Sequence, residues 1–127
     1  MSTNQYKGRT GFDRVVRATG YSMAGLRTAY CGESAFRQEA WLAVVMLPAA
    51  FWIGTSWIEV AVLAATVMLV LIVELLNSGI EAAIDRVSFE LHDLSKRAKD
   101  LASAAVFLSL VLCLGVWCAC LWHRFTA

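Results

Sequence analysis

Charge and proline are scarce in this sequence. Only 17% of its 127 residues are charged and one is a proline, whereas 59% are hydrophobic. Soluble domains of this length carry more charge, so the composition predicts a single membrane domain over residues 1–127. The formal net charge of +1 also argues against nucleic acid as a partner, because binding a phosphate backbone needs a basic excess on one face.

Several motifs are missing as well. Neither a Walker A loop nor a glycine-rich kinase loop occurs, so a nucleotide site would have to be built from side chains and helix ends. The cysteines have no C-x-x-C spacing and no histidine cluster nearby, and we interpret them as small apolar side chains. Residues 1–38 are polar and rich in arginine, which argues against a secretory signal at the start.

Three apolar segments predict an all-α integral membrane protein with three transmembrane helices. Residues 40–58 and 101–122 contain no charged residue, and residues 60–84 are apolar apart from Glu74 and Glu81. Each segment can cross about 30 Å of hydrocarbon at about 1.5 Å per residue.

The polar segments have predicted structures of their own. Residues 12–30 mix apolar and basic side chains around Gly20 and Gly25, which predicts one or two short amphipathic helices on the membrane surface. Residues 85–100 are polar without proline or glycine, and we expect them to continue the second span as helix before the chain turns.

The positions of lysine and arginine predict the orientation. They gather before the first span and between the second and third, and none lies in the short turn at 54–59. By the positive-inside rule, the N-terminus and the 85–100 loop face the cytoplasm. We therefore expect a multi-pass protein of the inner (cytoplasmic) membrane, with its N-terminus in the cytoplasm.

Polar residues form a stripe within the second span. Glu74, Asn77, Glu81 and Asp85 fall within about 80° of one another around a helix. A carboxylate facing lipid costs roughly 2.5–3.5 kcal/mol, so the stripe must face protein or a water-filled cleft. A polar clamp between helices is the alternative to a functional site. Four polar residues on one face are more than such a clamp needs.

Spacing along the stripe suggests a division of roles. Glu74 and Glu81 are about two turns apart, so they can hardly ligate one ion from the same helix. Glu81 suits Mg²⁺ bound with nucleotide phosphates, and Glu33 offers a second carboxylate for the metal. Glu74 lies deeper, where a general base could reach a lipid hydroxyl.

A basic cluster at the entrance to the third span suggests phosphate binding. Lys99 next to Asp100 can neutralise phosphate charge while the acid positions the nucleotide or the lysine. Lys96 and Arg97 have a simpler interpretation as anchors that fix the topology.

Five segments together resemble the bacterial integral-membrane diacylglycerol kinase family. They are GFDRVVRATGYS (11–22), E-x-A-F-R-Q-E (33–39), ELLNSGIEAAIDR (74–86), HDLS (92–95) and RAKDLASAAV (97–106), in that order. The resemblance implies a homotrimer of three-span protomers with an N-terminal surface helix. It also implies transfer of the γ-phosphoryl of MgATP to 1,2-diacylglycerol, giving phosphatidic acid and ADP, with membrane lipids and ATP as partners.

The resemblance assigns roles by motif position. It makes Glu74 the general base with Asn77 and Lys99 as further catalytic residues, and Glu33 and Glu81 the metal ligands. The implied nucleotide-binding residues are Arg14, Tyr21, Glu33, Glu81, Asp85, Glu90, His92, Lys99 and Asp100. The implied lipid-binding residues are Arg14, Ser22, Ala35, Arg37, Gln38, Glu39, Glu74 and Ser103. The usual Trp-Lys after the Tyr-Ser pair is here Met23-Ala24, and the usual alanine of the N-S-x-x-E run is Gly79.

Two alternative functions remain open at this point. The first is a kinase that acts on another lipid alcohol, such as undecaprenol, because no motif in the sequence identifies the acceptor lipid directly. A small oligomeric proton-coupled transporter would also place a glutamate within the membrane. The additional cytoplasmic carboxylates and Lys99, which suit Mg²⁺ and phosphate, favour the kinase.

Overall fold

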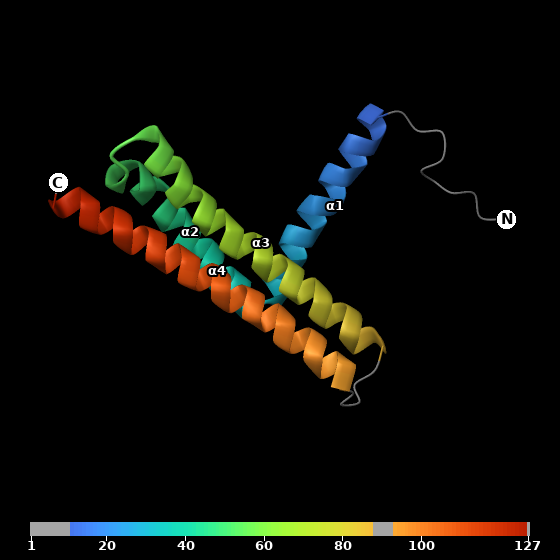
Figure 1. Cartoon of the computed structure of the whole chain (residues 1–127). Helices are drawn as coiled ribbons and strands as arrows, with labels where there is room; N and C mark the ends of the chain where they lie inside the picture. The colour runs from blue at the N-terminus through green and yellow to red at the C-terminus, as the bar shows by residue number, and fades with distance from the viewer. Residues whose placement is uncertain (1–10, 88–92, 127) are drawn as a thin grey trace.

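The computed structural model describes residues 11–87 and 93–126, and these residues form four helices. The helices are α1 (Gly11–Gly32), α2 (Ser34–Ile53), α3 (Trp57–Val87) and α4 (Asp93–Thr126). Helices α2, α3 and α4 run side by side as a bundle, and α1 leaves it at a steep angle (Figure 1). The predicted all-α class is confirmed for the described part of the chain.

The core of the bundle lies between α3 and its two neighbours. Leu63 of α3 and Ala50 of α2 are fully buried, and Trp117 of α4 packs into the same cluster. Alanines at positions 43 and 50 allow α2 to approach α3 closely, because they place only a methyl group at the contact. This packing holds the polar stripe of α3 against the other two helices.

The outer faces of the bundle are strongly apolar. Large side chains such as Phe51, Phe107 and Leu114 stand on the surface with about two thirds of their area exposed. So many large apolar side chains on the surface indicate contact with lipid or with another protein chain. Helices α3 and α4 are each long and apolar enough to cross a membrane, with a mean hydropathy of 2.5 over their most apolar stretch.

Helix α1 is longer than the one or two short helices predicted for residues 12–30. It is one continuous helix from Gly11 to Gly32, and Gly20 and Gly25 lie within it. A glycine within a helix costs only about 1 kcal/mol relative to alanine, which the flanking residues can offset. The hydroxyls of Thr19, Ser22 and Thr28 also donate to the carbonyls four residues earlier and so remain compatible with the helix.

The turn between α2 and α3 lies inside the apolar run 40–58. Helix α2 ends at Ile53 and α3 begins at Trp57, while Pro48 lies within α2 without ending it. At Gly54 an added Cβ would lie 2.6 Å from Val60 Cγ2 and 2.9 Å from the Val60 nitrogen. The close approach of the two helix ends therefore requires glycine here.

Candidate functional site

The polar stripe of α3 runs from the interior of the bundle to its solvent end. Glu74 is buried at 8% exposure, and Asn77 and Glu81 are partly buried. Asp85 is more open still, with 46% of its side chain exposed. The stripe thus passes from a dry region to a wet one within three turns of helix.

Glu39 of α2 faces the buried end of the stripe. Its carboxyl group lies within hydrogen-bonding reach of the carboxyl of Glu74. Two buried acceptor atoms in this region, Glu39 Oε2 and Asn77 Oδ1, have no hydrogen-bond partner in the described part of the chain. Unpartnered buried acceptors are costly, so this cluster is suited to a ligand that brings a donor, such as a hydroxyl group.

An apolar cavity adjoins this cluster. It has a volume of about 80 Å³ and lies between α2, α3 and α4, with Glu39 as its charged lining residue and Met46, Val67, Val70 and Cys113 among the apolar ones. The carboxyl cluster therefore has a polar side along the stripe and an apolar side toward the middle of the bundle.

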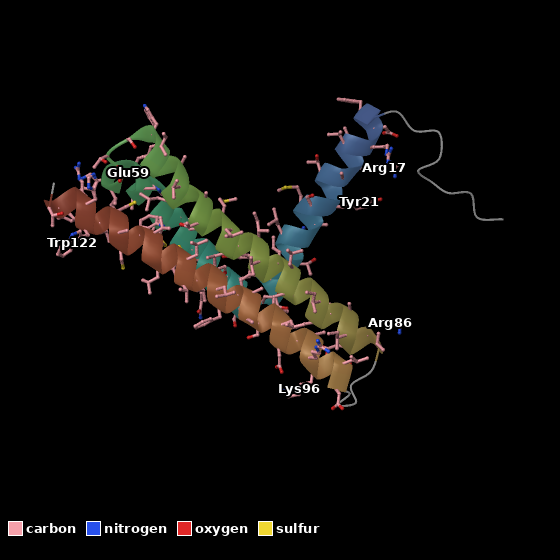
Figure 2. All side chains as sticks on the ribbon, viewed as in Figure 1. Arg17, Tyr21, Glu59, Arg86, Lys96 and Trp122 are labelled. Atoms are coloured by element: carbon pink, nitrogen blue, oxygen red, sulfur yellow. The ribbon has the colours of Figure 1, made fainter. Side chains whose placement is uncertain are left out.

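Two ion pairs mark the solvent end. Lys99 Nζ donates to Asp85 Oδ1 at 2.8 Å and so joins α4 to α3. Lys96 Nζ donates to Asp100 Oδ2 at 2.7 Å within α4, on a face where both side chains are 63% exposed. Figure 2 shows Lys96 and Arg86 at this end of the bundle and Glu59 and Trp122 at the other.

The environment of Lys99 is negative. This residue precedes the apolar run that begins at Leu101, so it lies outside the predicted span. The hydrogen bond to Asp85 raises the pKa of Lys99 above its ordinary value, and the charges of Asp85 and Glu81 act in the same direction. The ammonium group is therefore charged and held on the side of α4 that faces the stripe.

The junction of α1 and α2 is held by Arg37. Its guanidinium donates to the carbonyl oxygens of Tyr30 at 2.8 Å and Cys31 at 3.3 Å, and Trp41 Nε1 donates to the Tyr30 hydroxyl at 3.0 Å. A cation at the C-terminal end of a helix satisfies its last carbonyls and is favoured by the helix dipole. Arg37, which we expected to bind lipid, here caps α1.

Glu33 is the residue at which the chain turns from α1 into α2. Its backbone is extended, with φ −119° and ψ 109°. Its side chain borders an open groove of about 660 Å³ between α1 and α3, together with Ser22, Ser78 and Gly79. The predicted metal ligand thus lies on an accessible surface beside α3.

A single copy of the chain does not gather all the predicted site residues. Arg14 and Tyr21 lie on the part of α1 that leads away from the bundle, and Figure 2 shows Tyr21 there. Exposed positions on α2 and α4 hold Ala35, Gln38 and Ser103. Glu90 and His92 lie outside the described residues. Within 11–87 and 93–126, no group of three or more His, Cys, Asp or Glu side chains is arranged to hold a metal.

Sequence reasoning did not identify two of these relationships. It placed Glu39 in the site by resemblance, without its contact with Glu74, because the two residues lie on different helices far apart in the chain. It also missed Arg37 as a helix cap. The available signal was an arginine closely following the C-terminal end of a helix, which is a common capping position.

The sequence is similar to one protein family over most of its length. Residues 20–121 match the family described as prokaryotic diacylglycerol kinase. A diacylglycerol kinase of Pseudomonas aeruginosa is 52% identical over 117 residues, which is 92% of this chain and 95% of the relative. That of Escherichia coli K12 is 47% identical over 116 residues (91% and 95%), and that of Haemophilus influenzae is 43% identical over 108 (85% and 92%).

Proposed function

The chain belongs to the prokaryotic diacylglycerol kinase family, and we propose that it transfers the γ-phosphoryl group of ATP to the primary hydroxyl of a diacylglycerol. The products are phosphatidic acid and ADP. High identity over nearly the whole length of several relatives named diacylglycerol kinase supports this acceptor over undecaprenol and the kinase over a transporter.

The observation that carries the site assignment is the acceptor-rich cluster at Glu74. Glu39 Oε2 and Asn77 Oδ1 are buried without donors, so a lipid hydroxyl that donates its O–H to Glu74 would enter a region rich in hydrogen-bond acceptors. Glu74 accepts the proton of that hydroxyl while the lipid oxygen attacks the γ-phosphorus in line. The bond from the γ-phosphorus to the β,γ-bridging oxygen then breaks, and ADP leaves.

Mg²⁺ fits the carboxylates that the family motifs assign to it. Glu33 and Glu81 offer oxygen ligands at partly exposed positions, and the ion prefers one or two carboxylates together with phosphate oxygens. When bound, Mg²⁺ neutralises charge on the β- and γ-phosphates. Glu33 and Glu81 would hold the MgATP complex at the solvent end of the stripe.

Basic and polar groups at the same end would bind the rest of the nucleotide. Lys99 offers an ammonium to the phosphates, and Asp100 keeps the nucleotide-binding role that the motifs assign to it. The motifs assign the same role to Glu90 and His92 and, on the part of α1 that leads away from the bundle, to Arg14 and Tyr21 (Figure 2). The N-terminal part of α1 leads away from the bundle (Figure 1), which supports a homotrimer in which α1 of one protomer serves the site of a neighbour. The apolar outer faces of the bundle offer surface for such an assembly.

The membrane arrangement follows from the same features. We propose that α2 also spans the membrane, as the first of three spans before α3 and α4, with α1 on the cytoplasmic surface of the inner membrane. The steep angle of α1 to the bundle supports this, because a helix lying on the surface must run across the spans (Figure 1).

Lipid phosphorylation by the purified protein tests the proposal. The protein is reconstituted in vesicles with labelled ATP, Mg²⁺ and, in separate samples, diacylglycerol, undecaprenol or ceramide. We expect phosphatidic acid as the main product. A clear preference for either of the other acceptors would overturn the substrate assignment.

A further inference from the structure

The ion pair between Asp85 and Lys99 has no role yet in the proposed reaction. Its two side chains are 14 residues apart in sequence and belong to different helices, yet Nζ and Oδ1 are 2.8 Å apart. Both side chains are less exposed, at 43% and 46%, than those of the Lys96–Asp100 pair one turn away. The pair therefore fixes a cationic group of α4 against α3.

The direction in which Lys99 is held matters for the nucleotide. Glu81 and Asp85 are one turn apart on the same face of α3, and the charge of Glu81 acts on Lys99. The ammonium is thus kept beside the carboxylate that is proposed to hold the metal. Without a partner, the four-carbon stem of lysine would let the ammonium move among many rotamers.

A direct contact between Asp85 and ATP fits the geometry poorly. One carboxylate oxygen already accepts from Lys99, and a second negative group next to the triphosphate is repelled. We propose that Asp85 is a positioning residue, which holds the Lys99 ammonium beside Glu81 so that it meets the phosphates, and that Asp85 itself does not touch the nucleotide. This inference rests on the proposed kinase function.

The first test needs no kinase activity. The intact protein without nucleotide is treated with limiting acetic anhydride, and acetylation of Lys99 and Lys96 is measured by mass spectrometry. Asp85→Asn should raise the acetylation of Lys99 several-fold, because the freed amine reacts faster, and Asp85→Glu should restore much of the protection. Lys96, paired with Asp100, serves as an internal reference. Unchanged labelling of Lys99 in Asp85→Asn would overturn the inference.

The second test is a double-mutant cycle on kcat/KM for ATP and on ATP affinity, with Asp85→Asn, Lys99→Met and the double variant. A positioning role predicts that Asp85→Asn lowers kcat/KM by about fivefold alone and has no further effect once Lys99 is replaced. A direct contact between Asp85 and ATP predicts that the two effects multiply, which would overturn the inference. ATP affinity completes the cycle if Lys99→Met is too slow to assay.

A matched control removes charge without touching the pair. Arg97 lies at the same end of α4 on an exposed face, and Arg97→Gln should leave kcat/KM for ATP unchanged. A fivefold loss in this variant would mean that general charge explains the Asp85→Asn result, against the inference. Absence of lipid phosphorylation by the unaltered protein would instead overturn the proposed function, and the labelling result would still report on the pair.

Discussion

The indole N–H of Trp117 donates to Thr66 Oγ1, 3.1 Å away, and both side chains are buried where α4 packs on α3. The same N–H lies 3.3 Å from the Leu63 carbonyl oxygen, to which the Thr66 hydroxyl also donates at 2.8 Å. These hydrogen bonds satisfy the polar atoms of the Trp117 and Thr66 side chains in the apolar middle of the bundle. They therefore fix how α3 and α4 are aligned, and with them Asp85 and Lys99.

Trp117→Phe should destabilise the protein by roughly 1–2 kcal/mol, because it removes the interhelical hydrogen bond and leaves a small cavity. Unfolding in mixed micelles with increasing SDS measures the change. Trp122→Phe is the control, since Trp122 is 74% exposed and should change little. Equal losses in both variants would contradict a specific role for Trp117.

Replacing Arg37 should loosen the junction between α1 and α2. Arg37→Leu removes both contacts with the end of α1, whereas Arg37→Lys can restore one. Spin labels at positions 17 and 86, in a background without native cysteines, report the distance between α1 and α3. We expect a clearly broader distance distribution in Arg37→Leu than in Arg37→Lys. If Arg37 instead bound the lipid, the distribution would stay narrow and the KM for the lipid would rise.

Glu74→Gln should reduce turnover by about 10²–10⁴-fold, because it keeps the shape of the side chain but cannot accept a proton. Affinity for MgATP should stay close to normal, since Glu81 lies about two turns away. Glu59→Gln, at the opposite end of the bundle, should leave turnover unchanged. Substantial activity in Glu74→Gln would show that Glu74 acts only as a clamp between helices.

Glu81→Ala should raise the Mg²⁺ concentration needed for half-maximal activity and weaken MgATP binding, because the metal loses one of its two proposed carboxylates. Titration of Mg²⁺ at fixed ATP checks this, with calorimetry for nucleotide affinity. Lys96→Leu should have little effect on either quantity. An unchanged Mg²⁺ dependence in Glu81→Ala would rule out this ligand.

Gly54→Ala should cost about 1–3 kcal/mol in stability, because the new methyl group would meet the side chain and backbone of Val60. Gly20→Ala makes the same chemical change within α1, where nothing beyond the helix's own adjacent residues lies within 4 Å of the added methyl group, and should cause no loss. Unfolding of both variants under the same conditions provides the comparison. A similar stability for both would mean that the turn can relax.

The sequence predicted the parts of this fold that depend on local pattern. Apolar runs located the helices, and the helical period placed the four polar residues of α3 on one stripe, because both are set within a few turns of chain. The short turn expected at 54–59 contains the observed turn between α2, which ends at Ile53, and α3, which begins at Trp57. The sequence left open whether α1 is one helix or two, because glycine lowers helix propensity without excluding a helix.

Contacts between helices could not be derived in this way. The facing carboxyls of Glu39 and Glu74 and the pair of Asp85 with Lys99 depend on how the helices are rotated against one another, which tertiary packing decides. Arg37 carried only a general signal, an arginine shortly after a helix end, which does not specify its hydrogen bonds to the carbonyls of Tyr30 and Cys31. The roles of Glu33 and Glu81 toward a metal remain predictions from the motifs.

The steep angle of α1 to the bundle has a kinetic consequence under the proposed function. If α1 lies on the membrane surface near the depth of Glu74, ATP reaches the site by diffusion through the aqueous solution. The lipid reaches it by lateral diffusion within the bilayer. The rate then follows the mole fraction of diacylglycerol among the surrounding lipids, and its total amount in the sample has no direct effect. Adding inert phospholipid at constant diacylglycerol would slow the enzyme by surface dilution alone.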